Sequence, residues 1–274
     1  MRPEDYPPQE PFSNVARRYH DQVVRLGAGI AGIEVAYGDD PYQALALYLP
    51  EAPIGTVLAF VHGGGWTNGY KEWMAFMASP FTDAGIVFAS IGYRLAPAHV
   101  FPVGFDDVTR ALAWLHASIA AYGGDPARLF VGGHSSGGHY TALAAARRDW
   151  QGPLGLPTDV IRGCLPISGV YAFGADSGLA TRPRFLGDET NDVAASPIRR
   201  IDGAPPPFLI AYGECDFPHL RRQAGEMASA LERAGGEATL VELAGRDHFT
   251  ASLAGGEADG PWVPRALDWM ARHE

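Results

Sequence analysis

The stretch from Val131 to His139, which reads Val-Gly-Gly-His-Ser-Ser-Gly-Gly-His, constrains the fold of this chain more than any other. Apolar residues precede it and small apolar residues follow it, a pattern typical of a buried strand, a sharp turn and a helix packed closely on a sheet. Gly133 and Gly137 flank Ser135 because a turn this tight leaves no room for Cβ atoms. We therefore expect Ser135 at the apex of the turn. The alternative is a glycine-rich turn without chemical consequence.

Strand patterns alternate with helical patterns along the rest of the chain, which predicts an α/β fold. The expected strands are 33–37, 44–49, 56–61, 86–91, 129–131, 163–168, 208–212 and 239–243. The first two suggest an antiparallel hairpin, and a helix expected around Trp73 is ended by Pro80. Because no internal repeat or linker is visible, we predict a single domain over residues 1–274, with a mostly parallel sheet covered by helices on both faces.

Two segments are predicted to form a small cap beside the site. Residues 1–30 begin proline-rich and continue as a helix that Ser13 can cap. Residues 172–206 hold few apolar runs and many Gly, Pro, Asp and Arg residues, and a connection this long is rarely idle in a compact domain. We expect short helices there. A surface excursion with no role is the alternative.

Charge and composition narrow the class of partner. The 274 residues include 21 basic and 31 acidic ones, a formal net charge of −10, which opposes nucleic-acid or anionic-membrane binding. A small uncharged substrate fits this balance better, and no apolar leader or membrane-spanning run is visible, so we expect a cytoplasmic protein. Cys164 and Cys215 are expected to be free, buried thiols. A homodimer is left open.

A serine hydroxyl needs a base, an acid that orients the base, and hydrogen-bond donors before it becomes an effective nucleophile. The donors are expected in residues 62–66, His-Gly-Gly-Gly-Trp, which directly follow a predicted strand. Consecutive glycines let backbone N–H groups turn towards one point, so Gly63 and Gly64, together with Ser136, are the predicted oxyanion hole. A phosphate cradle would want a lysine directly after the glycines, but the nearest is Lys71.

The predicted base is His248, because among the nine histidines it alone follows a late strand end in the required region. His62 and His134 sit inside the two glycine motifs, where they are expected to brace loops by hydrogen bonding. His139 lies on the predicted helix after Ser135 and is expected to face the interior.

The predicted acid is Asp216, which lies just past the end of the strand 208–212. Glu214 is the reserve candidate, and Asp247 is expected to face solvent. The resulting order of serine, aspartate and histidine is the one found on α/β-hydrolase folds, not on chymotrypsin or subtilisin folds.

Four aromatic residues beside these motifs are candidates to line an apolar substrate pocket, although each could equally belong to the core: Trp66, Phe173, Phe217 and Phe249. A metal site is not predicted, because His134 and His139 are five residues apart and no cluster of further ligands joins them. No cofactor is expected.

The chain resembles the hormone-sensitive-lipase-like branch of the α/β hydrolases, which includes kynurenine formamidases and small esterases. The stretches that carry the resemblance are 62–66, 90–97 with the following Phe101-Pro102, 133–137, 213–216 and 247–249. The resemblance implies a nucleophile at Ser135 with Asp216 and His248 as its partners, and backbone donors from Gly63, Gly64 and Ser136. His134 leans towards formamidase-like and feruloyl-esterase-like members of the branch, whereas Gly65 leans away from the formamidases.

The expected activity is that of a serine carboxylesterase acting on small uncharged or aromatic esters through an acyl-enzyme intermediate. An arylformamidase acting on N-formyl aromatic amines is the second hypothesis, so the expected partner is a small ester or formamide. A non-catalytic ligand receptor on the same scaffold is the remote third hypothesis. It predicts a disabled triad, whereas every element of the triad is present in this sequence.

Overall fold

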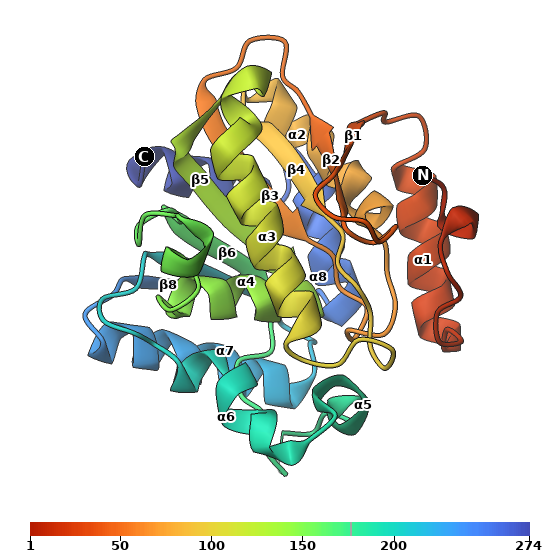
Figure 1. Cartoon of the computed structure of the whole chain (residues 1–274), viewed down its shortest axis with the longest axis vertical. Coiled ribbons are helices and arrows are strands. Elements are labelled where there is room, and N and C mark those ends of the chain that lie inside the picture. Colours follow the sequence, from red (N-terminus) through yellow and green to blue (C-terminus); the bar gives the residue numbers. More distant parts are fainter. Residues whose placement is uncertain (176) are drawn as a thin grey trace.

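An eight-stranded sheet forms the centre of the computed structural model, which describes residues 1–175 and 177–274 (Figure 1). Asp176, inside the predicted cap segment 172–206, lies outside the described residues. The strands are β1 (Ile33–Ala36), β2 (Ala44–Tyr48), β3 (Gly55–Val61), β4 (Val87–Ile91), β5 (Gly124–His134), β6 (Gly163–Ile167), β7 (Phe208–Gly213) and β8 (Ala238–Leu243).

The strand order is β1-β2-β4-β3-β5-β6-β7-β8. The pairs β1–β2 and β2–β4 are antiparallel and all the others are parallel, so β2 alone runs opposite to the other seven strands. The predicted fold class, a mostly parallel α/β sheet, is therefore confirmed. Parallel strands place their carboxyl ends at one edge, and the loops that follow β3, β5, β7 and β8 meet there.

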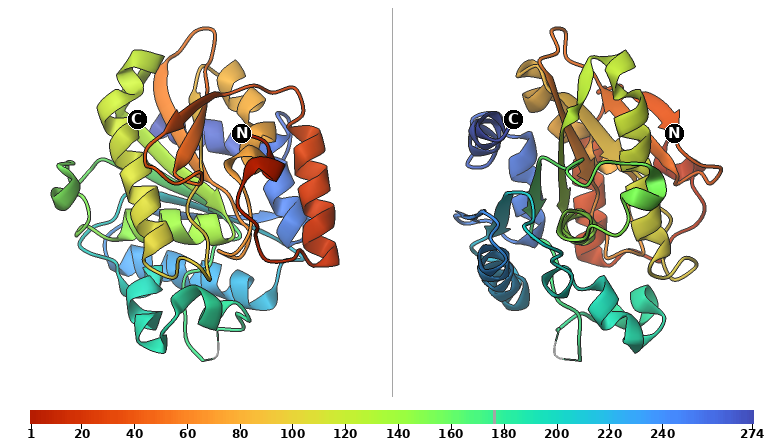
Figure 2. Two further views of the ribbon diagram at one scale, coloured as in Figure 1. Left: turned by 45° about the vertical axis from the view of Figure 1, so that its right-hand side comes forward. Right: turned by 60° about the vertical axis from the view of Figure 1, so that its left-hand side comes forward.

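Helices cover both faces of the sheet, which explains why the central strands are apolar on both sides. The helices α3 and α4 lie on one face, while α2 and α9 lie on the other (Figures 1 and 2). The longer helices are α1 (Asn14–Leu26), α3 (Val103–Ser118), α4 (Ser136–Ala146), α7 (Pro218–Arg233) and α9 (Val263–Arg272); the short ones are α2 (Ala78–Asp83) and α8 (His248–Leu253). Within the described residues, no helix is both long and apolar enough to cross a membrane.

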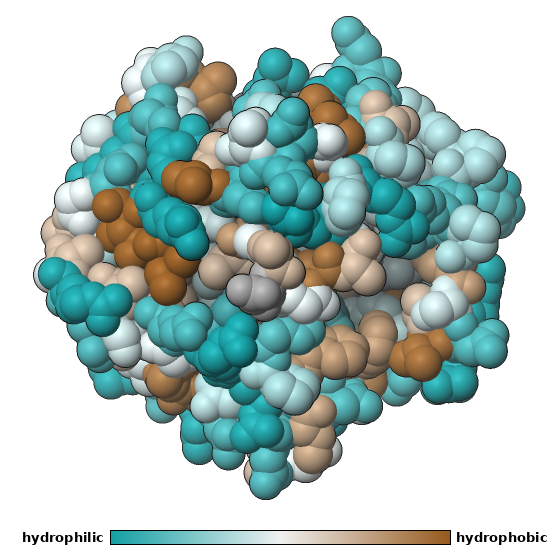
Figure 3. Space-filling view, turned by 90° about the horizontal axis from the view of Figure 1, so that it is seen from below, coloured by the Kyte–Doolittle hydropathy of each residue, from teal (hydrophilic) through white to brown (hydrophobic). Residues whose placement is uncertain are grey.

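Residues 172–206 fold as the predicted short helices, at the lower end of the molecule in Figure 1. They are α5 (Arg182–Leu186), α6 (Asp192–Ala195) and two 3-10 turns, η5 (Glu189–Asn191) and η6 (Pro197–Arg199). Seen from that end, the surface is largely polar with separate apolar patches between the polar residues (Figure 3).

Three local expectations are answered by the structure. Ser13 caps α1 as predicted, because its hydroxyl accepts from the backbone N–H of Ala16 at 3.2 Å. Pro80 does not end a helix: residues Lys71–Met77 form the 3-10 turn η2, and Pro80 lies in the first turn of α2, where its missing N–H has no partner to lose. Both cysteines are free, but only Cys164 is buried, since Cys215 lies in the exposed turn after β7.

The packing of α9 on the sheet generates a stability prediction. Trp269 is buried and its ring meets that of Phe130 on β5 edge-to-face at 6.1 Å. Trp269→Ala should lower the free energy of unfolding by about 3–5 kcal/mol, the usual cost of removing a large buried aromatic ring. Urea denaturation measures this, with Leu240→Ala on the exposed side of β8 as the control, expected to change stability by less than about 0.5 kcal/mol. Equal losses in both variants would contradict the packing described.

Candidate active site

The turn between β5 and α4 holds Ser135 in a backbone conformation that non-glycine residues rarely adopt, with φ 53° and ψ −116°. Its backbone N–H donates to the backbone oxygen of Ile167, on the neighbouring strand β6, at 2.9 Å. A Cβ atom on Gly133 would lie 2.4 Å from the carbonyl carbon of Gly137, and one on Gly137 would lie 2.1 Å from the oxygen of Val61. Both glycines are therefore needed for the reason predicted: backbone packs directly on backbone.

A chain of two hydrogen bonds connects the three predicted triad residues. The Nε2 atom of His248 lies 3.0 Å from the Oγ atom of Ser135, and its Nδ1 atom lies 2.9 Å from Oδ1 of Asp216. These side chains come from the β5–α4 turn, the start of α8 and the loop after β7. The loops that follow the parallel strands β5, β7 and β8 thus bring together residues that are up to 113 positions apart in the chain.

The Asp216 carboxylate is fully buried yet well supplied with donors. Burial opposes its ionisation, but hydrogen bonds from His248, from the hydroxyl of Ser168 and from the backbone N–H of Phe217 outweigh that effect and keep the pKa of Asp216 below its ordinary value. Because the ionised carboxylate can only accept, Nδ1 of His248 carries a proton. Its Nε2 atom then presents a lone pair to the Ser135 hydroxyl.

Ser168 was not predicted as a site residue from the sequence. It directly follows β6, the strand between β5 and β7, and its hydroxyl donates to Oδ2 of Asp216. The position of Ser168 at the carboxyl end of a predicted strand was the available signal. The sequence could not indicate that its side chain turns towards Asp216, because this depends on its positive φ of 52°.

The two other carboxylates weighed for the acid position make different contacts. Glu214 accepts from the backbone N–H of Gly245 at 2.7 Å. Asp247 caps α8 by accepting from the N–H groups of Phe249 and Thr250 at 3.1 and 2.8 Å. Asp247 thereby fixes the start of the helix on which His248 is the first residue.

Residues 62–66, called the glycine loop, follow β3 and lie against the turn that carries Ser135. A Cβ atom on Gly63 would lie 3.3 Å from the Cβ of Ser135, and Gly64 has a φ of 125° that favours glycine. Within residues 1–175 and 177–274, the N–H groups of Gly63 and Gly64 donate to no protein acceptor. Ser136 is the first residue of α4, so its N–H has no acceptor inside the helix.

Two buried histidines, His62 and His134, brace loops by hydrogen bonding, as predicted. His134 donates from Nε2 to the backbone oxygen of His248 at 2.9 Å, and His62 donates from Nδ1 to the oxygen of Gly63 at 2.7 Å. Burial first, and then the charge of His248, lower the pKa of His134 to about 3, while burial lowers that of His62 to about 4. Both rings are therefore neutral at pH 7 and act as hydrogen-bonding struts.

The segment 172–206 docks on the glycine loop through an aromatic cluster. The ring of Phe185 stacks on that of Trp66 at 4.3 Å. The indole N–H of Trp66 donates to Nδ1 of His139 at 3.1 Å, and Nε2 of His139 donates to the backbone oxygen of Ala195 on α6 at 2.7 Å. His139 faces the interior, as predicted, and connects α4, the glycine loop and α6.

The four aromatic residues considered for a substrate pocket fall into two pairs. Trp66 and Phe173 are only 2% exposed and pack against each other and against Phe185 of α5. Phe217 is 48% exposed with its ring 5.0 Å from that of His248, and the partly buried Phe249 lies edge-to-face with His248 at 5.3 Å. Phe217 and Phe249 are therefore the pair whose rings border His248.

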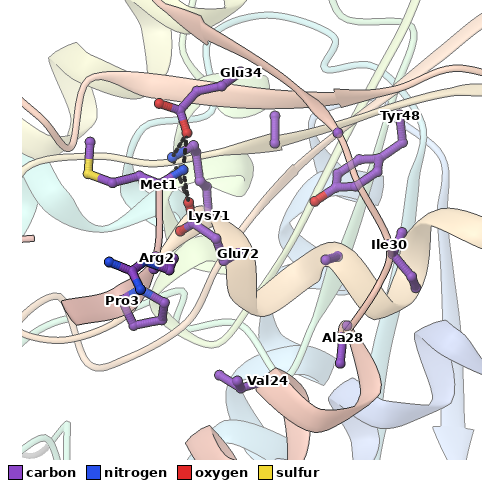
Figure 4. Close-up of a pocket in the computed structure, with 14 residues that line it drawn as sticks. Met1, Arg2, Pro3, Val24, Ala28, Ile30, Glu34, Tyr48, Lys71 and Glu72 are labelled. Atoms are coloured by element: carbon purple, nitrogen blue, oxygen red, sulfur yellow. Dashed lines mark hydrogen bonds and ion pairs between the residues drawn. The ribbon is translucent and has the colours of Figure 1, made fainter. Parts of the chain in front are cut away.

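A separate cavity of about 340 Å³ lies between α1, η2 and the strands β1 and β2 (Figure 4). The buried ammonium of Lys71 beside it pairs with Glu34 at 3.2 Å and Glu72 at 2.7 Å. None of the triad residues lines this cavity. Across the described residues, no group of three or more His, Cys, Asp or Glu side chains is placed to hold a metal ion.

The hydrogen bond from Ser168 generates a prediction for Asp216. Ser168→Ala removes a donor to the charged form of the carboxylate, so the pKa of Asp216 should rise. Carbon-13 NMR of aspartate carboxyl groups followed over pH measures this, with the exposed Ser229→Ala as the control. An unchanged pKa in Ser168→Ala would mean that the hydroxyl does not support the carboxylate.

Comparisons with known proteins agree with this architecture. A family described as the alpha/beta hydrolase fold matches residues 58–186. Esterase LipC of Mycobacterium tuberculosis is 33% identical over 251 residues, which are 83% of this chain and 61% of LipC. Kynurenine formamidase of Danio rerio is 26% identical over 225 residues, 80% of this chain and 74% of that protein. The chain thus spans less than two thirds of LipC.

Solved structures extend the likeness to the whole fold. The thermostable carboxylesterase EstE1, cloned from a metagenomic library, superposes with a TM-score of 0.75 at 23% identity, covering 94% of each chain. The chain thus has the α/β-hydrolase fold, and its sequence is similar to those of both esterases and a kynurenine formamidase.

Proposed function

We propose that the chain is a serine carboxylesterase that hydrolyses small uncharged or aromatic esters. The observation that carries this proposal is the pair of hydrogen bonds that connects Ser135, His248 and Asp216, at 3.0 and 2.9 Å. Beside them lie the N–H groups of the glycine loop, which donate to no acceptor among the described residues. A base, an orienting acid and oxyanion donors are the three requirements of a serine nucleophile. The similarity to an esterase, LipC, supports the same class.

Hydrolysis would proceed in two acyl-transfer steps. The Ser135 oxygen attacks the ester carbonyl carbon while His248 takes the hydroxyl proton, and the carbonyl oxygen becomes an oxyanion that accepts from Gly63, Gly64 and Ser136. The tetrahedral intermediate collapses, the C–O bond to the alcohol breaks, and His248 returns the proton to the leaving oxygen. Water then repeats the attack on the acyl-enzyme and releases the acid. Asp216 stays ionised throughout and stabilises the imidazolium.

The exposed aromatic ring beside His248 supports the choice of substrate. Phe217 presents nearly half of its surface to solvent, with its ring 5.0 Å from the His248 ring. His248 delivers the proton to the leaving group, so an apolar or aromatic alcohol would lie near this ring. The segments 1–30 and 172–206 are proposed to act as a cap over the same space. Phe185 and Ala195 of the second segment contact Trp66 and His139, at the glycine loop and α4.

Removal of the nucleophile tests the proposed activity. Ser135→Ala should reduce kcat for p-nitrophenyl acetate by about 10⁴-fold or more, because the loss of a triad serine abolishes acyl-enzyme formation. Steady-state rates would be compared with those of Ser229→Ala, an exposed serine on α7 whose loss should leave the rate within twofold. Retention of turnover in Ser135→Ala would overturn the proposal.

An arylformamidase is the second candidate, favoured by the 26% identity to kynurenine formamidase over 74% of that protein. The same triad could attack a formamide carbonyl, with His248 protonating the departing amine. The ratio of kcat/KM for p-nitrophenyl acetate to that for N-formylkynurenine separates the two. The carboxylesterase proposal predicts a ratio above one, and a strong preference for N-formylkynurenine would replace it with the formamidase.

A further inference from the structure

The side chain of Gln9, in the segment that precedes α1, binds the backbone of Gly69 just after the glycine loop. The Oε1 atom of Gln9 accepts from the backbone N–H of Gly69 at 2.9 Å, and its Nε2 atom donates to the backbone oxygen of the same glycine at 2.9 Å. Nε2 also lies 2.9 Å from the hydroxyl of Tyr42 on the other side. A two-point contact of this kind fixes the orientation of the Gly69 backbone, which a single hydrogen bond would leave free to turn.

Gly69 is pressed against the back of the loop that carries the proposed oxyanion donors. A Cβ atom on Gly69 would lie 2.4 Å from Nδ1 of His62 and 2.5 Å from the oxygen of Gly63, and the residue has a φ of 113°. Any outward or inward movement of Gly69 therefore acts on the peptide units of His62 and Gly63 directly.

The loop is also closed on itself between Gly64 and Asn68. The oxygen of Gly64 accepts from the N–H of Asn68 at 3.0 Å, and the Asn68 side chain donates to the backbone oxygen of Glu10 at 2.6 Å. Residues 9 and 10 thus hold the returning end of a turn whose first half contains Gly63 and Gly64. Consecutive glycines have the greatest conformational freedom of any sequence, so this turn needs external contacts to keep one shape.

We propose that Gln9 is a positioning residue for ester hydrolysis: it holds Gly69 against His62 and Gly63 and so keeps the N–H groups of Gly63 and Gly64 aimed at the oxyanion. The proposal rests on the proposed function of the glycine loop. Fixed donors contribute most to the transition state, where the negative charge has developed, and less to the bound substrate. Loss of Gln9 should therefore lower kcat and leave KM nearly unchanged.

A different set of contacts fastens the segment to the protein. The hydroxyl of Tyr6 accepts from Nζ of Lys71 at 2.6 Å and donates to Glu72 at 3.0 Å. The Glu10 carboxylate pairs with Arg184 of α5 at 2.8 Å. These anchors remain when Gln9 is replaced, so a Gln9 variant tests the contact with Gly69 and not the attachment of the whole segment.

The experiment compares Gln9→Ala and Gln9→Glu with Tyr6→Phe and Glu10→Gln in the full chain. Gln9→Glu keeps the acceptor for the Gly69 N–H but places a carboxylate oxygen against the Gly69 oxygen. The assays are kcat and KM for p-nitrophenyl acetate, the inhibition constant of an aryl trifluoromethyl ketone, whose adduct with Ser135 carries an oxyanion, and the melting temperature.

Both Gln9 variants should lose about 10–100-fold in kcat with KM within threefold, since removal of one whole oxyanion donor typically costs 10²–10³-fold. The inhibition constant of the ketone should rise by the same factor as kcat falls, whereas Tyr6→Phe and Glu10→Gln should stay within threefold in kcat. If Gln9→Ala is unfolded at the assay temperature, Gln9→Glu decides the question alone.

Unchanged kcat in the Gln9 variants would overturn the inference, as would an equal loss in Tyr6→Phe that follows a lower melting temperature. Failure of the proposed function is distinguishable, because it would appear as turnover in Ser135→Ala. An inactive Ser135→Ala beside a fully active Gln9→Ala would remove only the role of Gln9.

Discussion

Direct contact between backbones at the β5–α4 turn sets how closely Ser135 and the glycine loop approach each other. Gly137 leaves no space for a side chain against the oxygen of Val61, where the glycine loop begins. Ser135 has an unusual positive φ in this turn, and its backbone N–H donates a hydrogen bond to β6. In the proposed mechanism, this close approach brings the N–H groups of the glycine loop near the serine oxygen, so that both can act on one carbonyl group.

The charges in the site are arranged so that one proton can move. Asp216 is ionised although it is buried, because three donors hold it, and the neighbouring His62 and His134 are neutral because burial lowers their pKa values. His248 is therefore the group beside Ser135 that can accept a proton and find a negative partner. The neutral His134 still contributes, since it holds the main chain of His248 through one hydrogen bond.

Much of this site could be predicted from the sequence, because its groups follow strand ends and lie within short glycine motifs. Ser135, Asp216 and His248 each follow a strand of the parallel sheet, which is where such sheets place the residues of a site. The contacts missed are those between distant segments: Ser168 with Asp216, Gln9 with Gly69, and Phe185 with Trp66. No local pattern specifies such partners, since they depend on how the loops turn after the sheet has formed.

The fold shows the same division. Alternating patterns were sufficient for the strands and the main helices, whose apolar faces follow from periodicity. Pro80 was misplaced because a proline is as acceptable in the first turn of a helix as it is after the end of one. Cys215 was expected inside the protein on the basis of residue type, whereas its place in a turn beside Asp216 leaves it exposed.

The central claim is that Ser135 is an activated nucleophile, and covalent labelling tests it most directly. A p-nitrophenyl phosphonate should add one phosphonyl group per chain, located on Ser135 by mass spectrometry of the digested protein, with release of p-nitrophenol. Asp216→Asn should slow the labelling strongly, because the imidazole loses the partner that orients it. A labelled residue other than Ser135, or no adduct under conditions that label known serine esterases, would contradict the account.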